Sequence, residues 1–235
     1  MGGRGLHRAP GPGRSRGLAQ EGMTEEEFLR ELRRLIPELS SAALEKLLLY
    51  ADLLQEMAHP LGLIGTSERQ KVLAQHLLDS LALVPHLPSS GRLADLGSGA
   101  GLPGMVVKIA RPELEVWLIE PRRKAVSFLE YAMARLGLPK VRVLRARAED
   151  SRVPRHHFEV VTARALAELP QLWSLAEPLL RPGGRLWAFK ARNKLPLEMD
   201  RLRKRFPQAQ IRLHPYRVPE REKGVFVEII KQGVK

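Results

Sequence analysis

The chain has 235 residues, no cysteine and a formal net charge of +13 at pH 7. The lack of cysteine excludes disulfides and thiolate metal sites, the seven histidines lack ligand spacing, and no apolar run approaches the roughly 18 residues of a membrane span. A strongly basic chain usually binds a polyanion, although an arginine-rich proteome is an alternative source of the charge. We expect a cytoplasmic protein without metal that binds nucleic acid.

Residues 1–22 consist mostly of glycine, proline and arginine, and they cannot bury an apolar core. We expect a disordered basic leader without the apolar stretch of a signal peptide. Met23 precedes Thr24 and three glutamates, which favour the start of a helix. Translation is therefore expected to start at Met23, and a basic arm that contacts RNA is the alternative.

Residues 23–88 show the apolar spacing of helices interrupted by prolines, which predicts a helical N-terminal subdomain. Residues 89–235 are expected to form a second, cofactor-binding domain. The helices expected in the subdomain cover residues 24–36, about 41–57 and 67–84, with Ser67 as the cap of the third.

A glycine-rich loop follows the first expected strand of the second domain and leads into a helix. Its four glycines remove Cβ atoms that would keep a ligand from the backbone, and the N–H groups of the following helix point outward. Two patterns overlap here: Gly99-x-Gly101-x-x-Gly104 fits the dinucleotide fingerprint, and Asp95-x-Gly97-x-Gly99-x-Gly101 fits S-adenosylmethionine (AdoMet) methyltransferases. One tight turn does not need four glycines, so we expect a nucleotide-like cofactor.

Acidic residues end two neighbouring strands. Asp95 precedes the loop, where methyltransferases typically carry an acid, and we expect it to order the loop or to reach the methionine ammonium through water. Glu120 follows about twenty residues later, where an acid accepts both ribose hydroxyls. A solvated strand-end glutamate is the alternative.

The second domain alternates strands and helices, which predicts a parallel sheet covered on both faces. Two final strands without an intervening helix predict an antiparallel hairpin, as in class I AdoMet methyltransferases, whereas Rossmann dehydrogenases add a sixth parallel strand. The expected strands are 92–96, 115–120, 141–145, 158–163, 184–190, 211–218 and 225–230. The expected helices are 103–110, 122–136, 168–180 and 193–206.

Several motifs in a fixed order carry a resemblance to one family. They are Leu63-Ile64-Gly65, His76-Leu77-Leu78-Asp79-Ser80, the loop from Asp95 to Gly104, Arg111-Pro112, Arg145-Ala146-Arg147-Ala148-Glu149, Ala163-Arg164-Ala165 and Phe189-Lys190. Over roughly residues 40–232, the chain resembles the glucose-inhibited division protein B family, the RsmG methyltransferases. The resemblance implies transfer of a methyl group from AdoMet to N7 of the guanosine at position 527 of 16S ribosomal RNA. The partner is then 16S rRNA or a small-subunit particle, and we expect a monomer.

The resemblance also implies roles for individual residues. Gly97 and Leu102 resemble loop positions that contact AdoMet, and Ala148 and Glu149 resemble the pair beside the adenine. Arg164 matches a cofactor-contacting arginine, with a strand-end salt bridge as the alternative. The expected cofactor set is Asp95, Gly97, Gly99, Gly101, Leu102, Glu120, Ala148, Glu149 and Arg164.

His76 and Asp79 lie, in the family, at the cleft between the helices and the sheet, and they are the catalytic candidates; packing is the alternative for His76. Guanine N7 has a lone pair and no proton, so positioning and water exclusion are expected to carry the catalysis without a general base. Gly62 departs from the family, because many members have asparagine there, and any role of that side chain is in doubt.

Basic residues near the expected pocket are the substrate candidates. Arg122, Arg123 and Lys124 follow Glu120, and Lys190 ends the fifth expected strand. Phosphate contacts dominate the binding of RNA, so we expect these side chains to hold its backbone. Solvated surface charges are the alternative, as they are for the cluster from Arg201 to Arg205.

Three other functions remain open from the residues alone. A small-molecule methyltransferase is the main alternative, and its activity would not respond to salt. A dehydrogenase would bind NAD through the overlapping glycine pattern. A non-catalytic RNA-binding module would have no need of an intact glycine loop or of Glu120.

Overall fold

The computed structural model describes residues 23–193, 195–219 and 221–233, with no side-chain description for 221–223. The expectations for the leader at residues 1–22 lie outside this part of the chain. Within it, no helix has the length and apolar character to cross a bilayer. No group of three or more histidine, aspartate and glutamate side chains is arranged to hold a metal ion among the described residues.

The N-terminal helices begin where capping residues satisfy free N–H groups. Helix α1 (Glu25–Leu35) opens on a capping box, in which the Thr24 hydroxyl accepts from the Glu27 N–H and the Glu27 carboxylate accepts from the Thr24 N–H. Helix α2 (Ser41–Leu53) is capped by Ser40 and continues into a π-helical turn, η1 (Leu54–Ala58). Both helices agree with the expected ranges.

The third expected helix contains a widened turn. It consists of α3 (Arg69–Lys71), the π-helical segment η2 (Val72–Leu78) and α4 (Asp79–Leu81), followed by the short 3₁₀ helix η3 (Val84–His86). Ser67 as its cap is wrong: Glu68 is the N-cap residue and makes no side-chain cap bond. The apolar spacing does not distinguish a π-helical turn from an α-helical one. Such turns are frequent at functional sites, and η2 carries His76.

Seven strands form one sheet in the order β3-β2-β1-β4-β5-β7-β6, in which β7 runs antiparallel to its neighbours. This is the expected parallel sheet closed by a hairpin. The strands are β1 (Gly91–Leu96), β2 (Leu114–Ile119), β3 (Val141–Leu144), β4 (Phe158–Arg164), β5 (Leu180–Ala191), β6 (Gln210–Val218) and β7 (Arg221–Ile230). The helices between them are α5 (Gly104–Ala110), α6 (Arg123–Leu136), α7 (Leu169–Ala176), η4 (Glu177–Leu179) and α8 (Leu195–Arg205).

Strand β5 begins earlier than the expected residue 184, and α7 ends before the expected residue 180. Leu180 already pairs with Phe158 of β4, and a register shift follows between Phe158 and Val160. Gly183 adopts a φ of +77° there. Residues 181–183, which lie between the expected helix and the expected strand, therefore belong to an irregular strand.

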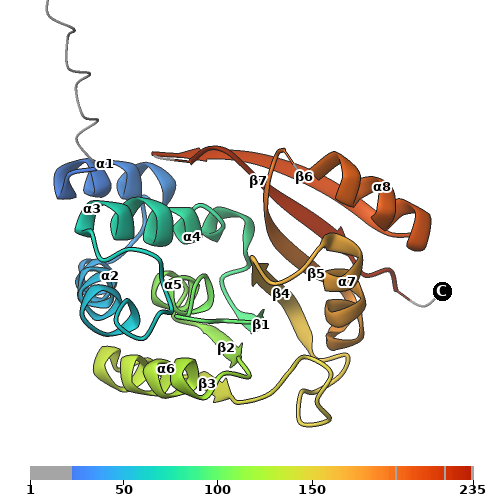
Figure 1. Cartoon of the computed structure of the whole chain (residues 1–235), viewed down its shortest axis with the longest axis horizontal. Coiled ribbons are helices and arrows are strands. Elements are labelled where there is room, and N and C mark those ends of the chain that lie inside the picture. Colours follow the sequence, from blue (N-terminus) through green and yellow to red (C-terminus); the bar gives the residue numbers. More distant parts are fainter. Residues whose placement is uncertain (1–22, 194, 220, 234–235) are drawn as a thin grey trace, which may run out of the picture.

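Helices cover both faces of the sheet (Figure 1). One apolar core joins α1, α2 and η2 to α5, α6 and one sheet face, with Phe28, Tyr50 and Met105 among its buried side chains. A second core lies between the other face and α7 and α8. The helical segment 23–88 thus shares a continuous core with the sheet, which fixes its position beside the carboxyl ends of the strands.

Candidate active site

The glycine loop joins β1 to α5 in a conformation that side chains would disturb. Gly97, Gly99 and Gly101 have φ values of +66°, +56° and +78°. A Cβ on Gly101 would lie 2.5 Å from Met105 Cγ and 2.6 Å from the Tyr50 hydroxyl oxygen. The Tyr50 hydroxyl also donates to the carbonyl oxygen of Ala100, so α2 and the loop are in direct contact. The loop therefore requires glycine at these positions.

Asp95 is fully buried beneath the loop. Its Oδ1 accepts from the Thr162 hydroxyl at 2.9 Å, and its Oδ2 accepts from the Gly104 N–H at 3.1 Å. Burial raises the pKa of Asp95 to about 6 despite these hydrogen bonds. Of the two expected roles, the geometry supports the ordering of the loop, because both carboxylate oxygens are engaged inside the protein.

Glu120 lies at the carboxyl end of β2, where it is 2% exposed. Its Oε2 accepts from the Gly99 N–H at 2.8 Å, and its Oε1 accepts from the Arg122 backbone N–H and Nε, both at 2.9 Å. The carboxylate therefore links the glycine loop to the start of α6. A ribose at this position would meet an acceptor whose orientation is already fixed.

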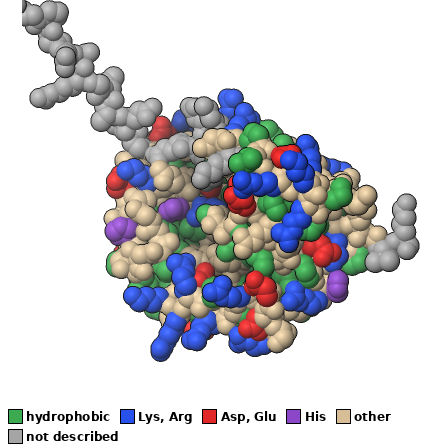
Figure 2. Space-filling view, turned by 45° about the vertical axis from the view of Figure 1, so that its right-hand side comes forward, with side chains coloured by type: hydrophobic (Ala, Val, Ile, Leu, Met, Phe, Trp, Pro, Cys, Tyr) green, Lys and Arg blue, Asp and Glu red, His purple; other side chains and the backbone are tan. Residues whose placement is uncertain are grey.

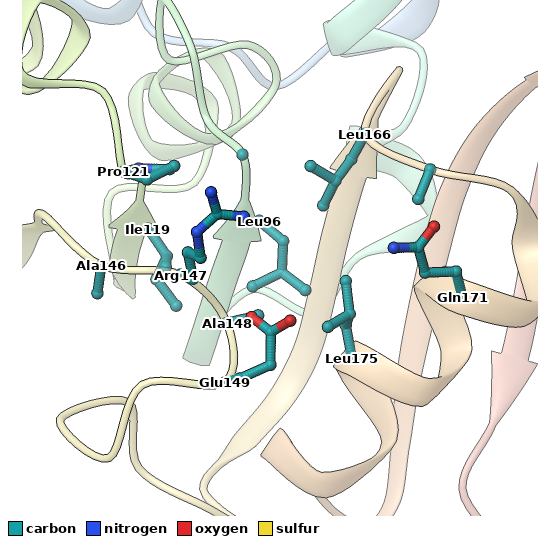
Figure 3. Close-up of a pocket in the computed structure, with 12 residues that line it drawn as sticks. Leu96, Ile119, Pro121, Ala146, Arg147, Ala148, Glu149, Leu166, Gln171 and Leu175 are labelled. Carbon is teal, nitrogen blue, oxygen red and sulfur yellow. The ribbon is translucent and has the colours of Figure 1, made fainter.

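A pocket of about 210 Å³ opens beside the loop at the carboxyl ends of the parallel strands (Figure 3). Open α/β sheets bind their ligands at this edge. One wall comes from the segment after β3, and the Glu149 carboxylate points into the space (Figure 3). The other wall comes from the end of β4 and from α7. The lining residues are Leu96, Gly97, Ile119, Pro121, Ala146, Arg147, Ala148, Glu149, Leu166, Ala167, Gln171 and Leu175.

Three of the nine expected cofactor residues line the pocket, and Asp95, Gly99, Gly101, Leu102, Glu120 and Arg164 do not. Gly97, Ala148 and Glu149 line it directly, and Glu120 holds the loop at its side. Leu102, within the loop, is buried at 5% exposure. Apolar walls with a few polar groups suit a purine nucleoside, so the residues fit the cofactor that the motifs predicted.

Sequence reasoning missed Leu166, Gln171 and Tyr50. Leu166 is 41% exposed, and a Cβ on Gly97 would lie 2.7 Å from its Cδ1. Ala165 before it has a φ of +55°, an uncommon conformation for a residue with a side chain. No local sequence pattern marks Tyr50 or Gln171. Tyr50 contacts the loop because α2 packs there, and Gln171 lines the pocket because α7 forms one of its walls.

Arg164 and Asp79 form an ion pair at the end of β4. Arg164 Nη1 donates to Asp79 Oδ2 at 3.2 Å and to the Gln75 carbonyl oxygen at 3.3 Å. Asp79 is fully buried, and its Oδ1 also accepts from the Tyr216 hydroxyl at 2.5 Å. The strand-end salt bridge considered for Arg164 is therefore present. Its contact with the cofactor stays a prediction.

His76 lies on η2 next to this ion pair. Both ring nitrogens are buried and make no hydrogen bond within the described part of the chain. Burial, and then the positive charge of Arg164, lower the pKa of His76 to about 4. The neutral ring offers one donor and one acceptor that the protein leaves unused.

Lys190 does not project into solvent. Its Nζ lies 2.6 Å from Glu198 Oε2 and donates to the Ala167 carbonyl oxygen at 2.7 Å. Glu198 also accepts from the Leu169 N–H at the start of α7. The solvated lysine is therefore wrong, and the geometry favours a structural contact over the substrate contact, which stays a prediction.

The basic residues expected to bind RNA after Glu120 differ in their contacts. Arg122 is bound to Glu120, whereas Arg123 and Lys124 are exposed at the first turn of α6 and form no ion pair with a described residue. Arg142, on β3, pairs with Glu115. Arg123 and Lys124 are therefore the better placed of the expected substrate residues.

Comparison with known proteins assigns the family. A family model described as rRNA small subunit methyltransferase G matches residues 43–218. The chain belongs to this family. A family member from Desulfitobacterium hafniense, named Ribosomal RNA small subunit methyltransferase G, is 44% identical over 161 residues, which cover 67% of each chain. A relative of the same name from Nocardioides sp. is 50% identical over 129 residues, which cover 55% of this chain and 51% of that protein.

A solved structure supports the fold of the family. A SAM-dependent methyltransferase from Aquifex aeolicus superposes with a TM-score of 0.53 at 16% identity, over 68% of this chain and 92% of that one. The predicted family and the class I methyltransferase fold are confirmed. The protein is an AdoMet-dependent methyltransferase, and AdoMet is its cofactor.

The low pKa of His76 predicts an acid-sensitive contribution to stability. Below about pH 6.5 the unfolded chain binds a proton at this histidine, while the folded ring stays neutral to about pH 4, so acid favours unfolding in this window. Wild type should lose about 2–3 kcal/mol more than His76→Asn between pH 7 and pH 4 in urea denaturation. The raised pKa of Asp95 acts in the opposite direction but is common to both proteins. Parallel pH profiles would contradict the prediction.

Proposed function

We propose that the protein transfers the methyl group of AdoMet to N7 of a guanosine in 16S ribosomal RNA, at position 527 as the family resemblance implies. The observation that carries the proposal is the pocket beside the glycine loop, with the Glu120 carboxylate fixed at its side, in a chain of this family. The substrate named for its relatives is small-subunit ribosomal RNA. Cytoplasmic location and a monomeric state stay predictions.

The pocket residues divide the cofactor between them. Ala148 and Glu149 are placed to hold the adenine, with the backbone N–H as donor and the carboxylate as acceptor. Glu120 accepts from the ribose hydroxyls, and the bare backbone from Gly97 to Gly101 passes beside the methionine part. Arg164, at the end of β4, is placed to pair with the methionine carboxylate.

The proposed methyl transfer needs no general base from a side chain. AdoMet supplies a methyl group on a positively charged sulfur, and guanine N7 presents an in-plane lone pair with no proton to remove. Asp79, buried between Arg164 and Tyr216, is not positioned as a general base. The protein therefore acts by holding both partners in line and by excluding water.

A basic rim borders the pocket; it consists of Arg123, Lys124, Arg145 and Arg147. These side chains are exposed at the carboxyl ends of β2 and β3, and none of them pairs with an acid among the described residues. Most of the other Lys and Arg side chains among the described residues form an ion pair, as Arg92 and Arg185 do with Glu159 and Glu228. Lys and Arg side chains also outnumber acidic ones on the face in Figure 2. Unpaired cations beside the pocket suit RNA phosphates.

Reversal of charge on the rim is expected to weaken RNA binding without affecting the cofactor site. Arg123→Glu with Lys124→Glu should lower rRNA affinity at least about 10-fold and reduce the salt slope by about 2, since each phosphate contact releases counterions. Arg135→Glu, at the other end of α6, is the control for a single charge reversal away from the rim. Filter binding across a salt series measures both effects. Equal losses in the rim variant and in the control would speak against this surface.

Transfer of tritium from labelled AdoMet tests the function itself. Purified protein should label small-subunit particles or 16S rRNA that lack the modification, and the signal should fall steeply with salt. Particles that already carry the mark should stay unlabelled. Labelling of small molecules alone, without any transfer to RNA, would instead establish the small-molecule methyltransferase.

A further inference from the structure

The C-terminal hairpin reaches the active site through one side chain. Tyr216 of β6 donates its hydroxyl to Asp79 Oδ1 at 2.5 Å, across 137 positions of sequence. Its ring stacks on Phe226, with centroids 3.9 Å apart and an angle of 5° between the planes. A Cβ on Gly224 would lie 2.4 Å from Tyr216 Cζ. The half-buried ring is therefore held by Phe226 and Gly224, and these contacts direct its hydroxyl toward Asp79.

Asp79 connects this tyrosine to the cofactor side of the sheet. The carboxylate is fully buried, and its second oxygen accepts from Arg164 Nη1 at 3.2 Å. A buried carboxylate is tolerated only when donors surround it. The Arg164 side chain is 16% exposed and donates also to the Gln75 carbonyl oxygen. Three separate elements, α4, β4 and β6, thus meet at one carboxylate.

We propose that Tyr216 is a positioning residue that fixes Arg164 through Asp79 and thereby sets the affinity for AdoMet. The tyrosine hydroxyl occupies one oxygen of Asp79 and leaves the other directed at the guanidinium. Without the hydroxyl, Asp79 Oδ1 loses this donor, so the carboxylate is held less firmly and the guanidinium bound to its other oxygen loses its fixed direction. The proposal rests on the role of Arg164 given under Proposed function.

Tyr216→Phe tests this with little disturbance, because it keeps the stacked ring and removes one donor. Calorimetry with S-adenosylhomocysteine should show about 10-fold weaker binding, since the lost hydrogen bond goes to a charged acceptor. The KM for AdoMet should rise to a similar extent, while kcat and the KM for rRNA change less than about 2-fold. Tyr131→Phe is the matched control, because its 40% exposed ring lies on α6, away from Asp79.

A double-mutant cycle separates positioning from general stabilisation. Arg164→Lys keeps the charge and loses the fork geometry, so Tyr216→Phe should have little further effect on cofactor affinity in that background. Additive losses would overturn the proposal, as would a lower melting temperature with unchanged affinity. Asp79→Asn provides a second test should Tyr216→Phe fail to fold, with the same 10-fold loss expected. If wild type itself bound no S-adenosylhomocysteine, the proposed function would fail instead.

Discussion

Gly101→Ala is expected to remove measurable cofactor binding and to lower the free energy of unfolding by about 2–4 kcal/mol. The added methyl group would lie 2.5 Å from Met105 Cγ and 2.6 Å from the Tyr50 hydroxyl oxygen, in a backbone with a φ of +78°. Either α2 or the loop must move to make room. Because the loop lies beside the nucleoside pocket, its displacement removes the surface on which the cofactor binds.

Gly233→Ala is the matched control, since no atom of the described residues lies within 4 Å of an added Cβ there. Urea denaturation measures the stability of both variants, and calorimetry with S-adenosylhomocysteine measures their affinity. Gly233→Ala should equal wild type in both experiments. Wild-type affinity in Gly101→Ala would show that the cofactor does not depend on this loop.

Glu120→Ala is expected to weaken AdoMet binding about 100-fold, since the change removes both the proposed acceptor of two ribose hydrogen bonds and the anchor of the loop. In the structure this carboxylate already accepts from the Gly99 N–H and from Arg122, so its removal also frees the loop from α6. Glu120→Gln retains one acceptor and should lose about 10-fold.

Glu115→Ala, on the same strand, removes a partly exposed carboxylate that contacts Trp117 and Arg142, at the opposite end of β2. Its cofactor affinity should match wild type. Titration with NAD should give no heat for any of these proteins. If Glu120→Ala weakened the binding of AdoMet by less than about 3-fold, Glu120 would not be the residue that binds the ribose.

The sheet could be predicted from the sequence because each strand is a short apolar run between turn signals. Strand β1 covers 91–96 where 92–96 was expected, and β2 covers 114–119 where 115–120 was expected. The errors arise where two structures share one pattern. A π-helical turn and an α-helix have similar apolar spacing, and the segment 181–183 between an expected helix and an expected strand belongs to β5.

The candidate site was predictable where the backbone itself forms it and where a residue directly follows a strand. The glycines from Gly97 to Gly104 indicate close approach whatever surrounds them, and Glu120 follows from its place after a strand. The partners of buried charges were not predictable. The bond between Lys190 and Glu198 and the contact of Tyr216 with Asp79 depend on how α8 and β6 pack, which no local pattern describes.

Chemical mapping of N7-methylguanosine in 16S rRNA gives the decisive test. Borohydride reduction followed by aniline cleaves RNA at this nucleotide, so primer extension locates it. Particles without the mark, incubated with wild-type protein and AdoMet, should acquire a single new cleavage at guanosine 527, and Glu120→Ala should leave it absent. Methylated product without such a cleavage would contradict transfer to guanine N7, and full cleavage with Glu120→Ala would contradict the assignment of the reaction to this pocket.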